Sequence, residues 1–213
     1  MGRISKQVEK WSGVFGKEYT DRNALSLENI ERLYERNYGI SRTEMNRKFI
    51  GDLKRSLRVL EVGSNIGNQL LCLRNMGFTN LCAVELQRYA IKLSKSRTQS
   101  ISTIQGCASN IPFKDESFDL VFTSGLLIHI HPADINVVLD EIFRCSKEYI
   151  WGFEYYADSL TEVNYRGENG LLWKTNFVRL YLDRFPGLRL VREERYKYLD
   201  NDNLDVMFLL KKE

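Results

Sequence analysis

The clearest candidate for a ligand site is the segment E-V-G-S-N-I-G at residues 61–67, in which an acid precedes two glycines. Gly63 permits a tight backbone turn beneath a ligand, and Gly67 lets a following helix begin close against a sheet. A pyrophosphate loop would carry three glycines as G-x-G-x-x-G, which this segment lacks. With Glu61 two residues before the first glycine, the loop instead favours a cationic ligand end, such as the amino group of a methionyl moiety.

A second acid, Glu85, ends the apolar run L-C-A-V-E at residues 81–85. A carboxylate at the end of the second strand of a Rossmann-like sheet can accept hydrogen bonds from both hydroxyls of a ribose. Because different adenosine cofactors use this arrangement, Glu85 predicts nucleoside binding rather than a particular reaction. The alternative for the loop at 61–67 is an ordinary strand, turn and helix of an α/β protein.

Residues 11–23, with the sequence W-S-G-V-F-G-K-E-Y-T-D-R-N, combine aromatic side chains and glycines at high density. One interpretation is an amphipathic helix that covers the end of a sheet. The other is a lid that closes Trp11, Tyr19 and Arg22 over a cofactor.

The elements that position these residues follow from hydrophobic periodicity. Apolar runs alternate with helical patterns, which predicts a mostly parallel sheet, and two final runs around a polar turn predict an antiparallel hairpin at its edge. The parallel runs are residues 59–62, 81–85, 101–106, 118–124 and 149–153, and the hairpin runs are 188–199 and 205–210. We therefore expect an α/β fold, a Rossmann-like seven-stranded mostly parallel sheet with an antiparallel C-terminal hairpin and an N-terminal helical cap. Residues 1–56 would form the cap or lid and residues 57–213 the main domain, within one compact unit.

Composition narrows the class of protein. The chain has 213 residues, of which 43% are hydrophobic, enough for a sizeable core. Its 31 basic and 28 acidic residues are spread along the chain, so we expect neither nucleic acid nor a membrane as partner. The four cysteines show no C-x-x-C spacing, and residues 1–6 contain no apolar run typical of a signal peptide. A cytoplasmic protein with reduced thiols is the expected result.

The loop at 61–67 resembles the first motif of class I S-adenosylmethionine-dependent methyltransferases, E-x-G-x-x-x-G. Two further segments match these enzymes in order: G-C-A-S-N-I-P-F at 106–113 is similar to G-D-A-x-x-L-P-F, and 118–129 matches F-D-x-V-x-x-x-x-x-L-x-H. Cys107 stands where an aspartate is common, which removes a side-chain acceptor for the adenine amino group and leaves the Ala108 amide for the ring. The resemblance implies S-adenosylmethionine as cofactor. The expected cofactor contacts are Trp11, Tyr19, Arg22, Glu61, Gly63, Ser64, Asn65, Gly67, Glu85, Leu86, Cys107, Ala108, Ser124, Gly125 and Leu126.

A more specific resemblance runs nearly end to end. The segments at 11–23, 154–156, 165–167, 183–186 and 208–211 resemble the methylases associated with pseudaminic acid biosynthesis. This resemblance implies a nonulosonic acid or an amino-sugar intermediate as substrate. One departure is L-W-K-T-N-F at 172–177, where the family pattern is L-F-K-R-D-F, so this chain's substrate can differ.

Methyl transfer mainly requires alignment and exclusion of water, and a general base helps when the acceptor is a hydroxyl or an ammonium group. His129 and Glu154 follow the fourth and fifth expected strands and are the candidate catalytic residues, each with a structural role as the alternative. Tyr155, Tyr165 and Arg166 are the candidate substrate contacts, the arginine as a clamp for a carboxylate or phosphate. Surface packing is their alternative. We expect no metal, because His129 and His131 lack a set of partner ligands.

Three functions remain open from the sequence. The favoured one is methyl transfer to a small molecule; the others are methylation of a macromolecule and a cofactor-binding protein without catalysis. A macromolecular substrate would favour an appended basic module, which the chain lacks. The sequence leaves the oligomeric state open.

Overall fold

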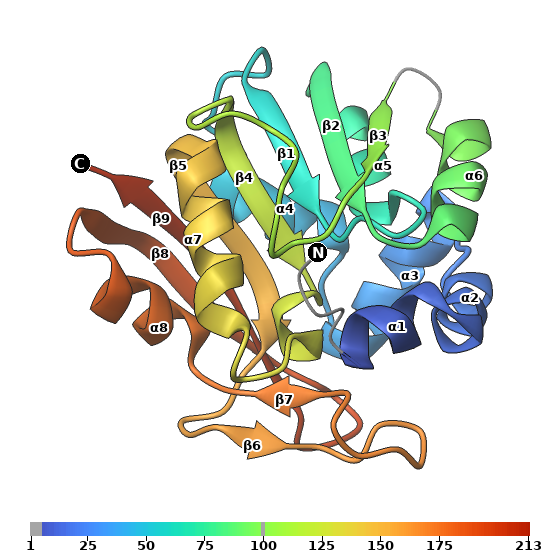
Figure 1. Ribbon diagram of the computed structural model, residues 1–213. Helices are drawn as coiled ribbons and strands as arrows, with labels where there is room; N and C mark the ends of the chain where they lie inside the picture. The colour runs from blue at the N-terminus through green and yellow to red at the C-terminus, as the bar shows by residue number, and fades with distance from the viewer. Residues whose placement is uncertain (1–5, 99–100) are drawn as a thin grey trace.

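The computed structural model describes residues 6–98 and 101–213, so the residues at 1–5 on which the signal-peptide prediction partly rests lie outside the described part. Its elements alternate between strands and helices around one large sheet (Figure 1). In chain order they are α1 (Lys6–Ser12), α2 (Val14–Arg22), α3 (Leu27–Tyr38), α4 (Arg42–Ile50), β1 (Arg58–Val62), α5 (Asn68–Asn75), β2 (Asn80–Glu85), α6 (Arg88–Arg97), β3 (Ser102–Gln105), β4 (Phe118–Ser124), the 3-10 helix η1 (Leu127–His129), α7 (Ile135–Cys145), β5 (Ser146–Tyr155), β6 (Thr161–Glu162), β7 (Trp173–Lys174), α8 (Phe177–Arg184), β8 (Leu188–Lys197) and β9 (Leu204–Lys212).

The large sheet has seven strands in the order β3-β2-β1-β4-β5-β9-β8. Strands β3, β2, β1, β4 and β5 run parallel, whereas β9 pairs antiparallel with both β5 and β8. The carboxyl ends of the five parallel strands therefore lie at one edge, where ligands of open α/β sheets bind. The predicted fold, including the antiparallel C-terminal hairpin, is confirmed.

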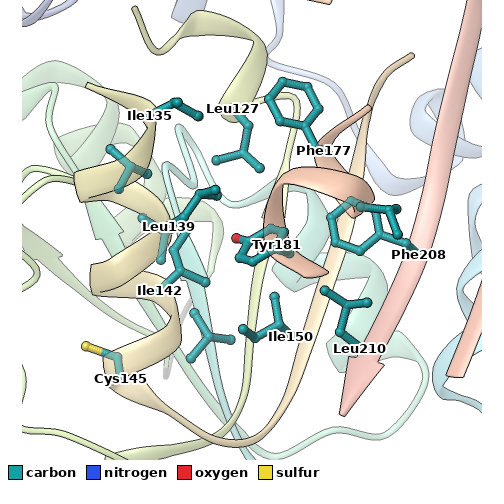
Figure 2. Packing of buried hydrophobic residues seen from close by; sticks show 14 of the residues in the cluster. Leu127, Ile135, Leu139, Ile142, Cys145, Ile150, Phe177, Tyr181, Phe208 and Leu210 are labelled. Carbon is teal, nitrogen blue, oxygen red and sulfur yellow. The ribbon is translucent and has the colours of Figure 1, made fainter. Parts of the chain in front are cut away.

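Two hydrophobic clusters cover the two faces of this sheet, as its alternating side chains require. Figure 2 shows one of them, in which Leu139 and Ile142 of α7 face Tyr181 of α8 and Phe208 of β9. On the other face, residues of α4 and α5 pack with β1, β4, β5 and β9. Helices α7 and α8 thus form one outer layer, and α4 and α5 contribute to the other.

The N-terminal helices contact the sheet in two ways. Helix α4 begins with a capping box, in which Ser41 and Glu44 exchange hydrogen bonds, and it buries Met45, Phe49 and Ile50 in the same cluster as β1. Helix α1 buries none of its residues completely and lies with α2 near the carboxyl ends of the strands (Figure 1). The first helices thus lie at the edge formed by the carboxyl ends of the parallel strands, while α4 belongs to the core.

The chain differs from the predicted elements around residue 174. Lys174 pairs with Thr161 in a small two-stranded sheet, β6-β7, that the sequence did not predict. Helix α8 begins after this small sheet, at Phe177, where the Asn176 side chain accepts a hydrogen bond from the Arg179 amide at 3.0 Å and caps the helix.

Two further observations concern the chemistry of the chain as a whole. All four cysteines, Cys72, Cys82, Cys107 and Cys145, are free thiols. Within the described ranges, every helix is too short or too polar to cross a membrane.

Candidate functional site

A cavity of about 870 Å³ lies at the carboxyl ends of the parallel strands and is lined in part by residues of α1, α2 and α3. Helix α3 contributes one face with helical spacing, from Ile30 to Tyr38. Most of the residues predicted from the sequence line this cavity: Trp11, Tyr19, Glu61, Gly63, Ser64, Asn65, Glu85, Leu86, Cys107, Ala108, Ser124, Gly125, Leu126, His129, Tyr155 and Tyr165.

The glycine loop between β1 and α5 has the backbone that its sequence predicts. Gly63 has φ 74°, and a Cβ atom there would lie 2.6 Å from Leu126 Cδ1, so only glycine fits without displacing that side chain. Asn65 also adopts a positive φ of 49°. The loop therefore turns tightly beneath the cavity and directs its amides toward the end of β2.

Glu85 is anchored by that loop. Its carboxylate accepts hydrogen bonds from the Asn65 amide and the Gln87 amide, both at 2.7 Å. Each oxygen has a second lone pair, so the carboxylate can still accept both hydroxyls of a ribose. Burial raises the pKa of Glu85, and the backbone hydrogen bonds partly offset that rise.

Glu61 lies at the floor of the cavity and is 2% exposed. Its Oε2 has no hydrogen-bond partner within the described part of the chain. Burial raises the pKa of Glu61 well above its usual value, while the positive charge of Arg42 acts in the opposite direction. A cationic ligand end would supply the missing partner, which fits the amino group of a methionyl moiety.

The wall expected to hold an adenine is formed by the turn after β3. The Cys107 sulfur lies 3.2 Å from the Ser109 hydroxyl and forms a hydrogen bond with it. Cys107, Ala108 and Leu126 all line the cavity. This wall offers apolar surface and backbone groups in place of the aspartate common in the resembling enzymes.

The roof consists of α1 and α2 and is attached on both sides of the cavity. Gln87 Nε2 donates to the carbonyl oxygens of Trp11, Ser12 and Gly13 at 3.3, 2.9 and 3.0 Å. On the other side, Lys10 forms an ion pair with Glu168 at 2.5 Å. The roof therefore joins the cofactor side of the cavity to the loop after β6.

Beneath this roof, Trp11 packs on His129 with 4.4 Å between ring centroids. His129 Nδ1 lies 2.8 Å from the Leu171 carbonyl oxygen, which can only accept, so Nδ1 carries the proton and Nε2 is an acceptor. Burial lowers the pKa of His129 to about 4. The ring is therefore neutral at pH 7 and is a weak base, though well placed to accept a hydrogen bond.

Glu154 does not line the cavity. Successive residues of a strand point to opposite faces, so Phe153 and Tyr155 reach the cavity and Glu154 points away. Its Oε1 accepts a hydrogen bond from the Leu126 amide at 3.2 Å, at the start of η1. Burial raises the pKa of Glu154 to about 7, with hydrogen bonds from Thr123 and the η1 backbone acting against it. The predicted direct contact with an acceptor is not what the structure shows.

Three other predicted residues, Arg22, Gly67 and Arg166, also do not line the cavity, each for a local reason. Arg22 is exposed, because the inward face of α2 carries Gly16, Tyr19, Thr20 and Asn23. Gly67 has φ 80° and supports the start of α5 against Thr98.

Arg166 is exposed at the tip of a two-residue hairpin turn. Tyr165 and Glu168 exchange backbone hydrogen bonds across this turn, and Arg166 and Gly167 both have positive φ, as a type I′ turn requires. The turn therefore directs Tyr165 toward the cavity and places Arg166 at the surface.

Two functional candidates were missed from the sequence. Arg42, in the first turn of α4, is fully buried and donates to the hydroxyls of Tyr34 and Ser124 at 3.2 and 3.4 Å. A first-turn arginine is ordinarily exposed, so no pattern indicated it. Asp205 lines the cavity from β9, and its signal was an acid within the otherwise apolar run L-D-V-M-F-L-L at 204–210.

Comparisons with known proteins agree with this geometry. Residues 60–149 match the methyltransferase domain family. Among curated proteins, none matches the chain. A Burkholderia thailandensis 1,6-didemethyltoxoflavin N1-methyltransferase, solved with its substrate and S-adenosylhomocysteine, is a similar structure, with TM-score 0.74 and 15% identity over 100% of this chain and 91% of that chain.

Two other similar structures come from archaea. One is an S-adenosylmethionine-dependent methyltransferase of Methanosarcina mazei, with TM-score 0.64 and 16% identity over 76% of this chain and 95% of that one. The other is from a Haloferax volcanii complex of the Trm112 methyltransferase activator with a methyltransferase, with TM-score 0.65 and 16% identity over 90% and 94% of the two chains. At these identities the likeness concerns the fold.

Residues 60–149 therefore form a methyltransferase domain within a class I methyltransferase fold. This family match and the solved neighbours, one of which holds S-adenosylhomocysteine, indicate an S-adenosylmethionine-dependent methyltransferase.

Proposed function

We propose that this enzyme transfers a methyl group to a small molecule bound in the same cavity as the cofactor. The observation that carries the proposal is a single cavity of about 870 Å³ whose lining extends from Glu85 on β2 to Asp205 on β9. This volume lies in the range typical of small-molecule sites, roughly 300–1,000 Å³. The roof is attached on both sides, which suits an enclosed acceptor.

In this proposal, the predicted cofactor contacts act through the groups that reach the cavity. Glu85 accepts the ribose hydroxyls, Glu61 pairs with the amino end of the methionyl moiety, and Ala108 and Leu126 contact the adenine. The bound cofactor supplies an electrophilic methyl on a sulfonium. The chain holds the acceptor in line with that methyl and excludes water, with Trp11 and Tyr19 closing the site from above.

His129 and Glu154 receive different roles. We assign to the neutral His129 ring a hydrogen bond from an acceptor hydroxyl or amine to Nε2, because this residue lines the cavity. Glu154 is a positioning residue, since its carboxylate holds the backbone at Leu126, where η1 begins. Arg22, Gly67 and Arg166 act through the fold rather than through contact with ligands.

For the acceptor, we propose an amino-sugar or nonulosonic-acid intermediate. The support is the sequence resemblance along the chain together with Tyr155 and Tyr165, whose rings line the cavity and suit stacking on a sugar face. The Burkholderia neighbour acts on a small molecule, which is consistent with this substrate class. The division into a cap at 1–56 and a main domain at 57–213 is retained as part of the proposal.

A macromolecular acceptor is the second candidate. The Haloferax neighbour was solved in complex with a protein partner, a methyltransferase activator, and the acceptor is not named there. A macromolecular acceptor requires α1 and α2 to move, because these helices cover the cavity.

Incubation with methyl-labelled S-adenosylmethionine tests the proposal. The enzyme is supplied with a metabolite extract, total RNA or total protein, and mass spectrometry follows the label. We expect label in a low-mass product, and its loss in Glu85→Ala. Label in RNA or protein alone would favour the second candidate. Tight binding of S-adenosylhomocysteine with no labelled product in any pool would favour the non-catalytic alternative.

A further inference from the structure

The end of the cavity farthest from the cofactor loop in the sheet contains a buried acid, Asp205, which is 1% exposed. Its Oδ2 accepts a hydrogen bond from the Tyr38 hydroxyl at 2.5 Å and another from the Tyr198 hydroxyl at 3.3 Å. Its Oδ1 has no partner within the described residues. Two hydrogen bonds therefore fix Oδ2, whereas Oδ1 can accept a hydrogen bond from a ligand.

No described cation lies within ion-pair distance of Asp205. The nearby cations have other partners: Lys174 donates to Asn203 at 2.5 Å, and Arg42 donates to the hydroxyls of Tyr34 and Ser124. A buried carboxylate with no cation in direct contact is destabilising, and a cationic ligand would remove that cost.

The surroundings of Asp205 are aromatic. Tyr38 and Tyr198 pack at 4.7 Å between ring centroids, and Tyr34 lies 5.8 Å from Phe153. Tyr155 is directly opposite Asp205 in the antiparallel pair of β5 and β9. All of these residues line the cavity. Lys174 already lies over the Tyr155 ring, and Arg42 lies over the Tyr34 and Phe153 rings. The acid with the Tyr38 and Tyr198 rings beside it therefore has the chemistry that recognises an ammonium group, through a charge-assisted hydrogen bond and cation–π contact.

We propose that Asp205, Tyr38, Tyr155 and Tyr198 form a subsite for a protonated amine carried by the methyl acceptor. This inference rests on the proposed function and specifies the substrate class within it. A neutral hydroxyl would leave the carboxylate charge uncompensated, and an anionic group would be repelled by it. The subsite therefore selects amine-bearing acceptors over their hydroxyl analogues.

The subsite requires the carboxylate form of Asp205. Burial raises the pKa of Asp205 to about 7, while hydrogen bonds from Tyr38 and Tyr198 and the charges of Lys174 and Arg42 act to lower it. Amine binding should therefore be strongest above pH 7 and weaken as the pH falls through that value. An alkyl ammonium group loses its proton only well above pH 8. The ligand ammonium and the Asp205 carboxylate are therefore both charged near pH 8.

The test compares benzylamine with benzyl alcohol, two probes of similar shape that differ in charge. Their affinities are measured by ligand-observed NMR at pH 8 and pH 5.5, on the full chain with S-adenosylhomocysteine present. We expect benzylamine to bind at least about tenfold more tightly at pH 8, and this preference to shrink severalfold at pH 5.5.

Two variants assign the preference to the subsite. Asp205→Asn should bind both probes equally, whereas Asp158→Asn should keep the preference, because Asp158 accepts from the Tyr156 hydroxyl at 2.5 Å outside the cavity. If Asp205→Asn does not fold, Tyr198→Phe serves in its place. It removes one hydrogen bond to Oδ2, so it should move the loss of amine binding to higher pH.

Equal affinity of the wild-type protein for both probes at pH 8, or a preference that persists in folded Asp205→Asn, would overturn the subsite. Neither result affects binding of S-adenosylhomocysteine or the labelled-methyl assay. Conversely, failure of those two assays would overturn the proposed function while leaving the comparison of amine and alcohol intact.

Discussion

The two ends of the cavity each contain a buried carboxyl, and the two are held in opposite ways. Glu85 accepts hydrogen bonds from backbone amides of residues 65 and 87, which belong to the adjoining loop and its own strand end. Asp205 accepts from the side-chain hydroxyls of Tyr38 and Tyr198, which come from α3 and from the segment after β8. Backbone donors persist through sequence change, whereas side-chain donors do not. The proposed cofactor end is thus fixed by the fold, and the proposed acceptor end can be altered residue by residue.

The largest expected effect is at the fixed end. Glu85→Ala should weaken S-adenosylhomocysteine binding by about 2 to 3 kcal/mol, roughly 30- to 150-fold, because charge-assisted hydrogen bonds to the ribose are lost. Isothermal titration calorimetry measures the change. Glu148→Ala is the control, since Glu148 pairs with Lys211 at 3.0 Å away from the cavity. Unchanged affinity in a folded Glu85→Ala protein would remove the ribose assignment.

The second effect concerns stability at the acceptor end. The pKa of Asp205 is about 7 when folded and near 3.9 when unfolded, so the folded state holds a proton that the unfolded state releases between these values. Stability contributed by this proton is present below pH 4 and is lost as the pH rises through 7. Asp205→Asn should therefore be more stable than wild type at pH 8, by about 1 to 2 kcal/mol after the weaker hydrogen bonds of the amide are counted.

Urea unfolding at pH 5 and pH 8 checks this prediction. The advantage of Asp205→Asn over wild type should be larger at pH 8. An advantage that is equal at both values would mean that Asp205 does not titrate in this range.

A smaller effect distinguishes Glu154 from a catalytic base. Glu154→Gln should keep cofactor affinity and lower turnover by less than about tenfold, because this side chain supports the backbone at Leu126. Removal of a true general base typically costs 10²- to 10⁴-fold, so a loss of about a hundredfold with normal cofactor binding would restore Glu154 to the catalytic group. Single-turnover rates with labelled cofactor make the measurement.

The smallest expected effect is at the roof. Lys10→Ala removes an ion pair whose side chains are 36% and 43% exposed, which is worth about 0.2 to 1 kcal/mol. Hydrogen exchange in residues 6–22 should become slightly faster in this variant and should slow when S-adenosylhomocysteine is added to wild type. Exchange that is the same with and without the ligand would indicate a static cover rather than a lid.

The contrast between local contacts at Glu85 and long-range contacts at Asp205 explains which features could be predicted from the sequence. The cofactor end could be predicted because Glu61, Gly63 and Glu85 lie in strand and loop segments whose geometry is local. The order of the sheet followed from alternating apolar runs. Asp205 and Arg42 were missed because their environment arises from elements distant in the chain, and a single acid or arginine carries no periodic signal.

Other errors were local ones. Glu154 was predicted to face the acceptor, although strand alternation with Phe153 and Tyr155 directs it to the opposite face. Arg166 was read as a clamp, although its turn with Gly167 places it outside the cavity. In both cases a neighbouring tyrosine of the segment lines the cavity, whereas the predicted charged side chain does not.

Gln87 connects Glu85 to the helices that form the roof of the cavity. Its amide holds the Glu85 carboxylate, and its side chain holds the three carbonyl oxygens at the junction of α1 and α2. One residue therefore links Glu85, the proposed ribose acceptor, to the roof. Under the proposed function, we therefore expect the nucleoside ligand to bind before the acceptor and to leave after the methylated product.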